Sequence, residues 1–216
     1  IVLNTHLHGD HVLGNKYFAE QGAVVLAHPN VRPGLTNPNT SALTGRTPDP
    51  LDESFLADVE ITGGDAVTLN GLTARFYHEP TAHTDGDIWV YFEEADVIHT
   101  GDLLFAGTFP FIDLDNGGTV NGFIAGMQSI VDVANPDTLI ISGHGPIVDE
   151  TALEASIDML TEARARIVAL VAEGYDLEAI QAADPLADFT PDWNWRFITT
   201  ERMVWTLYRD ITGKTA

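Results

Sequence analysis

The sequence predicts a fold of the α/β or α+β class, and two observations lead to this prediction. Short apolar segments typical of buried strands alternate with helical segments through the earlier part of the chain. From about residue 150 onward, the apolar residues recur at helical spacing. No linker separates two domains, so we expect a single domain over residues 1–216 with the C-terminal helices 150–216 packed on it.

The earliest elements are expected to be two strands around a helix, followed by a long loop. Residues 1–4 and 23–27 are short apolar runs of the kind that form buried strands. Residues 10–21 between them are expected to form a helix, which Gly22 is suited to end. Residues 29–54 carry five of the eleven prolines, so this segment is predicted to be a long loop or lid.

The middle of the chain is predicted to form a hairpin and further strands. The pair Asn70-Gly71 favours a type I′ turn between strands 66–69 and 72–78. The remaining elements expected before residue 150 are strands 88–92 and 96–100, a glycine-rich loop 105–122, a helix to about residue 134 and a strand 138–142. After residue 150 we expect a long helix that Gly174 closes, a short helix near 176–183 and a last helix near 199–211.

The charge balance excludes several classes of partner. The chain has 32 acidic and 10 basic side chains and a formal net charge of −22. A field of this sign repels phosphate backbones, so we expect neither a nucleic acid nor a membrane surface as partner, and a small-molecule substrate instead. No apolar run approaches the about 20 residues that span a bilayer. The absence of cysteine excludes thiolate metal sites and thiol nucleophiles but leaves the cellular compartment open.

The segment THLHGDHVLG (5–14) is the most informative about chemistry. Four side chains that can bind a metal fall within six positions: His6, His8, Asp10 and His11. They lie between a predicted strand and a predicted helix, which is where α/β proteins place ligand sites. His6 and His8 are two residues apart and point the same way in an extended chain, whereas Asp10 and His11 lie one turn further on. Imidazole and carboxylate together suit zinc, and also iron, manganese or cobalt.

Three more polar residues occupy similar places further along the chain. His83 lies in PTAHTDGD between the hairpin and a strand, Asp102 follows a strand in HTGDLLF, and His144 follows a strand in LIISGHGP. Glycines beside Asp102 and His144 allow the backbone to come close to a bound group. Each residue alone is more often structural, but together with the cluster they form a set.

This set, HLHGDH followed in order by His83, Asp102 and His144, resembles the metallo-β-lactamase superfamily over residues 4–146. A weaker resemblance, to its lactamase-like bacterial hydrolases, rests on GNKYFAEQGAVVLAHPNVR, PTAHTDGDIWVYF, HTGDLLF and the aromatic C-terminal segment. The resemblance implies an αββα sandwich with a helical C-terminal end. Since that fold places strands before the HxHxDH segment and only residues 1–5 precede it here, we expect the first strands to be missing from this chain.

The resemblance also implies a dinuclear site with two Zn²⁺ ions, for which iron or manganese are alternatives. The implied ligands of the first, three-histidine site are His6, His8 and His83. Those of the second site are Asp10, His11 and His144, and Asp102 would bridge the two sites. Asp10 would also be catalytic, because it can orient the attacking hydroxide and move its proton. Asp102 stands where the best-known lactamase subclass has a cysteine, which favours the broader glyoxalase-like hydrolases.

We therefore expect a zinc hydrolase in which a metal-bound hydroxide attacks a lactam, lactone, ester or thioester. Two alternatives stay open: an iron-dependent oxygenase of the same fold and a non-catalytic metal-binding module. A glutathione thioester would call for basic residues in the C-terminal helices, but 150–190 holds only Arg164 and Arg166. The oligomeric state is left open.

Several residues near the motifs have a structural explanation as well as a functional one. Phe105, Phe109 and Phe111 are expected to pack in the core rather than to form an apolar substrate wall. Thr84, Asp85 and Asp87 are either hydrogen-bond partners of a ligand histidine or turn residues. His28 ends a strand and is a weaker candidate for lining the site.

Overall fold

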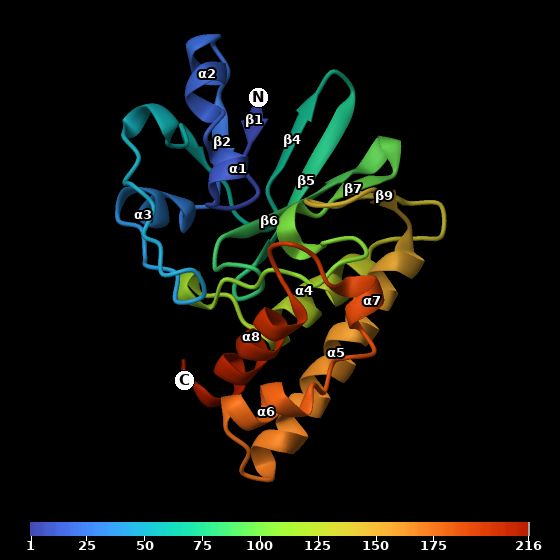
Figure 1. Cartoon of the computed structure of the whole chain (residues 1–216). Helices are drawn as coiled ribbons and strands as arrows, with labels where there is room; N and C mark the ends of the chain where they lie inside the picture. Colours follow the sequence, from blue (N-terminus) through green and yellow to red (C-terminus); the bar gives the residue numbers. More distant parts are fainter. Residues whose placement is uncertain (216) are drawn as a thin grey trace.

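Two β-sheets face each other between two layers of helices in the computed structural model, which describes residues 1–215 (Figure 1). The smaller sheet is parallel and consists of β1 (Val2–Leu3), β2 (Val25–Ala27) and β3 (Val59–Glu60). The larger sheet has the order β4-β5-β6-β7-β8-β9. Its strands are β4 (Ala66–Leu69), β5 (Leu72–Glu79), β6 (Asp87–Phe92), β7 (Val97–His99), β8 (Leu139–Ile141) and β9 (Ile147–Val148).

The larger sheet brings the ends of three strands to one edge. β6 is antiparallel to both β5 and β7, and β8 is parallel to β7. The carboxyl ends of β5, β7 and β8 therefore meet at the same edge of the sheet, and so do the loops that follow them. These are the loops that carry His83, Asp102 and His144.

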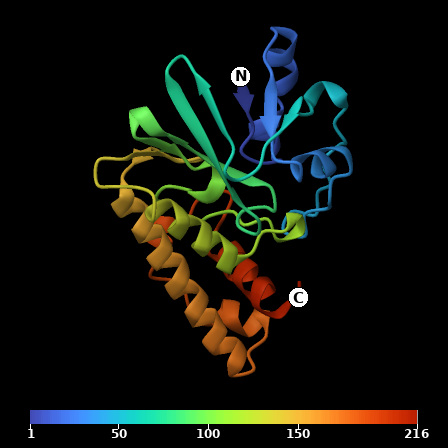
Figure 2. The ribbon, with the colours of Figure 1, turned by 180° about the vertical axis from the view of Figure 1, so that it is seen from behind.

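The helices form the two outer layers, and the two opposite views in Figures 1 and 2 agree on their placement. The helices α1 (Gly9–Val12), α2 (Asn15–Glu20) and α3 (Val31–Thr36) lie beside the smaller sheet. On the side of the larger sheet lie α4 (Val120–Val131), α5 (Glu150–Ala172), α6 (Leu177–Ala183), α7 (Thr190–Trp193) and α8 (Thr200–Thr212), with α6 packed on α8 at the end away from the sheet. None of the described helices is both long and apolar enough to cross a membrane.

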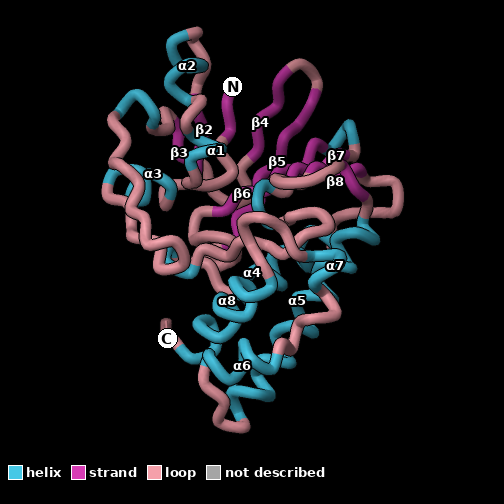
Figure 3. The backbone as a smooth tube through the Cα atoms, viewed as in Figure 1, coloured by secondary structure: helices cyan, strands magenta, loops and turns pink. Residues whose placement is uncertain are grey.

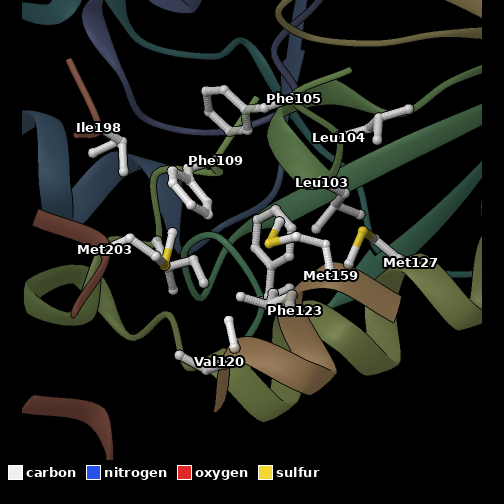
Figure 4. Close-up of a cluster of buried hydrophobic side chains, with 14 of the residues drawn as sticks. Leu103, Leu104, Phe105, Phe109, Val120, Phe123, Met127, Met159, Ile198 and Met203 are labelled. Atoms are coloured by element: carbon white, nitrogen blue, oxygen red, sulfur yellow. The ribbon is translucent and has the colours of Figure 1, made fainter. Parts of the chain in front are cut away.

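Three clusters of buried side chains hold these layers together. One lies between the sheets and includes Leu26, Phe76 and Ile88. A second, which includes Val12 and Leu35, joins the smaller sheet to its helices. The largest lies between the larger sheet and the C-terminal helices, and Figure 4 shows part of it. Its members include Trp89, Phe109, Phe123, Met127, Met159, Leu160 and Met203. The αββα arrangement predicted from the sequence is confirmed.

The predicted hairpin is also confirmed, whereas several short elements were not predicted. Asn70 and Gly71 have φ values of 53° and 80°, as a type I′ turn requires. The helix expected over 10–21 is divided at Leu13-Gly14 into α1 and α2. The predicted loop 29–54 contains α3, and β3, β9 and α7 were missed. Figure 3 shows how much of the chain between the sheets and the C-terminal helices is loop.

The first turn of α4 packs tightly on the loop that carries His83. Thr119 caps this helix by accepting a hydrogen bond from the Gly122 backbone N–H at 2.9 Å. The Thr119 backbone N–H in turn donates to the Thr81 carbonyl oxygen at 2.9 Å. A Cβ atom at Gly122 would overlap that same carbonyl oxygen. The close approach of α4 therefore requires glycine at position 122.

The substitution Gly122→Ala tests this contact. We expect it to lower the free energy of unfolding by about 1–3 kcal/mol, because the helix or the His83 loop must shift to accommodate the methyl group. Asn121→Ala, at an exposed position of the same helix, should change stability by less than about 0.5 kcal/mol. Urea denaturation of the three proteins provides the measurement, and equal midpoints for Gly122→Ala and the parent would contradict the packing argument.

Candidate metal centre

The seven predicted ligands come together where the loops after β1, β5, β7 and β8 meet. Their potential ligand atoms form two groups, and within each group these atoms lie within 4.8 Å of one another. The groups are His6, His8, His83 and Asp102 on one side and Asp10, His11 and His144 on the other. Side chains up to 138 positions apart in the sequence thus converge on one place.

The first group is an enclosed set of three imidazole rings. His8 Nδ1 lies 3.1 Å from His6 Nε2 and 2.9 Å from His83 Nε2. His6 and His83 are almost fully buried. Burial holds the pKa of His6 well below its ordinary value, and burial followed by the neighbouring His8 lowers the pKa of His83 to about 4. Both rings are therefore neutral near pH 7, which is the form that binds metals.

The second group lies at the open side of the centre. Asp10 Oδ2 is 3.2 Å from His144 Nε2 and 3.5 Å from His11 Nε2. The Asp10 side chain is 55% exposed and that of His144 is 40% exposed, so solvent or a substrate can reach this group. Burial alone would lower the pKa of His11, but the carboxylates of Asp10 and Asp102 raise it to about 9. A raised histidine pKa marks a negative environment that attracts cations.

Asp102 lies between the two groups. Its Oδ2 atom is 3.6 Å from His83 Nε2 and 3.3 Å from His144 Nε2, and its Oδ1 atom is 3.1 Å from His11 Nε2. Burial would raise the pKa of Asp102, but the His11 and His144 rings hold it well below its ordinary range. One carboxylate therefore faces nitrogen atoms of both groups.

The surroundings of Asp102 fit a metal ion better than a closed network of hydrogen bonds. Despite the nearby His11 ring, the buried Oδ1 atom accepts no hydrogen bond within the described residues 1–215. A buried carboxylate oxygen without a partner costs free energy unless a cation compensates it. A Cβ atom at Gly143 would collide with Oδ1, so glycine there leaves the carboxylate free to face the centre. The donor set of imidazole nitrogen and carboxylate oxygen fits zinc, iron or manganese.

Two of the histidines are oriented by hydrogen bonds to the ring nitrogen that faces away from the centre. His83 Nδ1 lies 2.8 Å from the Phe111 carbonyl oxygen and can only donate to it, which leaves Nε2 free for a metal. His8 Nε2 lies 2.8 Å from Asp113 Oδ2, which leaves Nδ1 free. Such partners set the tautomer and orientation of ligand histidines.

Thr5 acts in the same way on two further rings. Its Oγ1 atom lies 3.0 Å from His6 Nδ1 and 3.2 Å from His11 Nδ1. A hydroxyl oxygen has two lone pairs, so it can accept a hydrogen bond from both rings at once. The Nε2 atoms of both rings then face the centre, where a metal ion can bind them. A Cβ atom at Gly101 would come within 2.7 Å of the Thr5 Cβ, so the loop of Asp102 packs directly on this residue.

Two of these orienting residues, Thr5 and Asp113, were not singled out from the sequence. Thr5 adjoins the histidine cluster, and this proximity was the only available signal. Asp113 lies 105 positions from His8, so nothing in the sequence connects the two. Residues 84–87 form a turn, in which Asp87 accepts hydrogen bonds from the Thr84 backbone N–H and hydroxyl at 2.8 and 2.6 Å. His28 stacks on His78 and belongs to neither ligand group.

Aromatic side chains flank the centre from His8 to His144. Phe105 and Phe109 are buried, as expected. Phe111 is half-buried: it packs against the largest cluster, as expected, and it also stacks on the His8 ring at a centroid distance of 5.4 Å. Trp195 donates its indole N–H to the Phe109 carbonyl oxygen at 2.8 Å. The segment between α7 and α8 thus forms part of the aromatic surface that flanks the centre.

The double role of Thr5 gives a specific prediction. Thr5→Val keeps the side-chain shape but removes the acceptor of both Nδ1–H groups, so we expect the affinity of each ligand group for added zinc to fall by about 10–100-fold. Thr5→Ser retains the hydroxyl and should remain close to the parent. Competition with a chromogenic chelator measures both affinities. A fall in affinity at only one of the two ligand groups, or at neither, would show that Thr5 does not orient both rings.

Comparison with known proteins places this geometry in a family. The model of the metallo-β-lactamase superfamily matches residues 1–170. A hydroxyacylglutathione hydrolase of Synechococcus is 32% identical over 106 residues, which cover 49% of this chain and 35% of that protein. The probable metallo-hydrolase YqgX of Bacillus subtilis is 27% identical over 68% of this chain and 69% of its own length. The chain spans less than half of the length of two relatives: 35% of the hydroxyacylglutathione hydrolase and 43% of a protein from Aquifex aeolicus.

Solved structures show the same fold. The B3 metallo-β-lactamase BLEG-1 is 27% identical with a TM-score of 0.61, covering 74% of this chain and 76% of its own. TTHA1623 in a di-iron-bound form is also 27% identical, with a TM-score of 0.55 over 71% of this chain and 73% of its own. The sec-alkylsulfatase Pisa1 of Pseudomonas sp. shares only 15% identity, but its fold covers 98% of this chain and 41% of its own at a TM-score of 0.69. The family match over most of the chain, together with the fold and the clustered histidines, shows that this protein belongs to the metallo-β-lactamase superfamily.

Proposed function

We propose that this chain is a hydrolase that uses two divalent metal ions, zinc in the first instance, to cleave a small carbonyl substrate such as a lactone, ester, thioester or lactam. The observation that carries the proposal is the position of Asp102, whose carboxylate faces His83 on one side and His11 and His144 on the other at 3.1–3.6 Å. A single ion would need only one of the two ligand groups. The hydrolase names of several relatives support the reaction class.

When bound, two such ions would supply a Lewis acid and lower the pKa of a water molecule towards about 7. The side chains of this chain then have distinct tasks. His6, His8 and His83 form the enclosed half of the site. Asp10, which is 55% exposed beside His144, can accept a proton at the open side and return it to a leaving group.

The distribution of basic residues argues against a glutathione tail in the substrate. Arg166 is engaged by Asp188, with Nη1 and Nη2 at 2.6 and 3.0 Å from the two carboxylate oxygens. Arg164 lies 3.8 Å from an oxygen of Asp210. The two arginines between residues 150 and 190 are therefore both paired with acidic side chains. We favour simple acyl substrates for this reason, although some relatives are named hydroxyacylglutathione hydrolases.

The native metal is a separate part of the proposal. Imidazole and carboxylate ligands accept iron and manganese as well as zinc. TTHA1623, which is 27% identical, was solved with two iron ions. Zinc is our first choice because it has no redox chemistry that could compete with hydrolysis, and iron is the principal alternative.

Removal and return of the metal tests the proposal together with one substitution. Chelation should abolish hydrolysis of aryl esters and lactones, and added zinc should restore it at close to two equivalents per chain. Asp102→Ala should lower turnover by at least about 100-fold and weaken the ion held by Asp10, His11 and His144 more than the other, because a shared ligand is lost.

Asp137→Ala is the matched control, since it removes an exposed carboxylate away from the centre and should leave both readouts unchanged. Elemental analysis and steady-state kinetics provide the measurements. A metal content that stays near one equivalent in excess zinc would reject the dinuclear site. No hydrolysis of esters, lactones, thioesters or β-lactams by the fully loaded protein would reject the hydrolase.

A further inference from the structure

A cavity of about 480 Å³ lies next to the candidate metal centre. Its walls come from α1, α3, the segment 37–51 and the half-buried Phe111 and Phe197. His8 and Asp113 also line it, so the cavity adjoins the three-histidine half of the centre. The volume falls within the range of about 300–1,000 Å³ that is typical of small-molecule sites. A water molecule in the liquid occupies roughly 30 Å³. With the same volume for each non-hydrogen atom of a ligand, the cavity holds a group of up to roughly fifteen non-hydrogen atoms.

The lining of the cavity is mainly apolar. The apolar surface comes from the side chains of Leu7, Val12, Leu35, Leu51, Phe111 and Phe197. Leu13 stands at the rim with 57% of its surface exposed. Arg46 is the only basic residue among the described residues of the lining, and it is exposed. Such a surface favours a hydrocarbon group over a phosphate or another polyanion.

The walls are fixed by packing within the protein. Val12 and Leu35 belong to the buried cluster that joins α1 and α3 to the smaller sheet. Phe111 stacks on the His8 ring, and Phe197 packs edge to face on Phe111 at a centroid distance of 5.3 Å. These contacts hold the apolar surface in place without a ligand. A group that binds there therefore loses less free energy to the ordering of side chains.

The segment 37–51, which we call the roof segment, is also tied to the body. Asp115 Oδ2 accepts a hydrogen bond from the Ala42 backbone N–H at 2.7 Å and from Arg209 Nη1 in α8 at 3.0 Å. Asn39 donates to the Asp115 carbonyl oxygen at 2.9 Å and to Asn116 Oδ1 at 3.1 Å. At its other end, the Leu51 backbone N–H donates to the Leu35 carbonyl oxygen at 2.9 Å. The cavity is thus a built feature of the fold.

The position of Asp10 indicates which part of a substrate the cavity takes. Asp10 and His144 do not line the cavity and lie at the exposed side of the centre. A leaving group that takes its proton from Asp10 must lie on that side and can depart into solvent. The acyl part then lies on the side of His8, where the apolar cavity begins.

We infer that the cavity binds the hydrocarbon acyl chain of the substrate, so that the preferred substrates are medium-chain acyl esters, lactones or thioesters. This inference rests on the proposed hydrolase function, whose substrate class it specifies. Each methylene that enters the cavity should raise kcat/KM by about fourfold. The rise should stop when the cavity is full.

Two variants with opposite expectations test the acyl site. Leu13→Asp places a charge at the rim, and we expect it to lower the ratio of kcat/KM for 4-nitrophenyl octanoate over 4-nitrophenyl acetate by about tenfold or more. Leu69→Asp introduces the same charge at a similarly exposed leucine, 52% against 57%, on the distant β4–β5 hairpin. It should leave the ratio unchanged. A parent ratio of one or less, or an equal ratio in parent and Leu13→Asp, would overturn the inference.

A binding measurement separates this inference from the hydrolase proposal, because it needs no turnover. Titration calorimetry of the metal-loaded protein with 1-octanol should show binding with a negative heat-capacity change, which marks burial of apolar surface. Ethanol should not bind, and Leu13→Asp should weaken octanol binding where Leu69→Asp does not. Octanol binding without ester hydrolysis would retain the apolar site and reject the hydrolase. Ester hydrolysis without octanol binding would retain the hydrolase and overturn the acyl site.

Discussion

The burial of one carboxylate among imidazole rings is the constraint around which the site is organised. Asp102 is 5% exposed, and an isolated charge in that environment would destabilise the fold by several kcal/mol. The charge is compensated by the neighbouring His11 and His144 rings, whose pKa values Asp102 helps to raise. To place it there, the chain uses Gly143, where any side chain would strike the carboxylate, and Gly101, which packs on Thr5 with a φ of 54°. The local backbone thus follows from the need to present this carboxylate to both groups.

The topology of the two sheets places the remaining candidate ligands next to one another. Three strands of the larger sheet end at one edge, and the segment after β1 meets them from the smaller sheet, where the Ile88 backbone N–H donates to the Thr5 carbonyl oxygen at 2.7 Å. Further backbone hydrogen bonds join the ligand loops to one another, among them Gly143 N–H to the Gly101 carbonyl and Asp113 N–H to the His83 carbonyl, both at 2.9 Å. Because backbone groups hold the loops in place, the ligand side chains are not needed for that task and can turn one polar atom each towards the centre.

The sequence predicted the parts of this structure that depend on local chemistry. The Asn-Gly turn, the strands around the motifs and the set of seven converging residues all carry signals that lie within a few neighbouring positions. Elements set by long-range packing were missed. Pro33 and Gly34 argue against the helix α3, yet burial of Val31 and Leu35 four residues apart stabilises it, and Pro33 lies in its first turn, where no intrahelical N–H is needed.

Other omissions have the same origin. β3 is two exposed residues paired to β2, so it has no hydrophobic periodicity. The division of the helix at Leu13-Gly14 accompanies a buried amide pair, in which Asn4 and Asn15 exchange hydrogen bonds of 2.8 and 2.7 Å. The orienting role of Asp113 depends on a contact with His8 that no local pattern encodes. The acyl cavity likewise exists only once the roof segment lies against Asp115.

The contacts of the roof segment connect the site thermodynamically to distant parts of the chain. One path runs from Asn39 through Asn116 to Asp113, which also bonds His8; the Asn116 amide donates to Asp113 Oδ2 at 2.7 Å. Asp115 joins the same segment to Arg209 of α8. Linkage is reciprocal, so a ligand that strengthens the contacts of the roof segment also stabilises α8 and the orientation of His8, and loss of the contact between Asp115 and α8 weakens binding of that ligand by the same factor. The C-terminal helix is in this sense an energetic component of the site, although it contributes no candidate metal ligand.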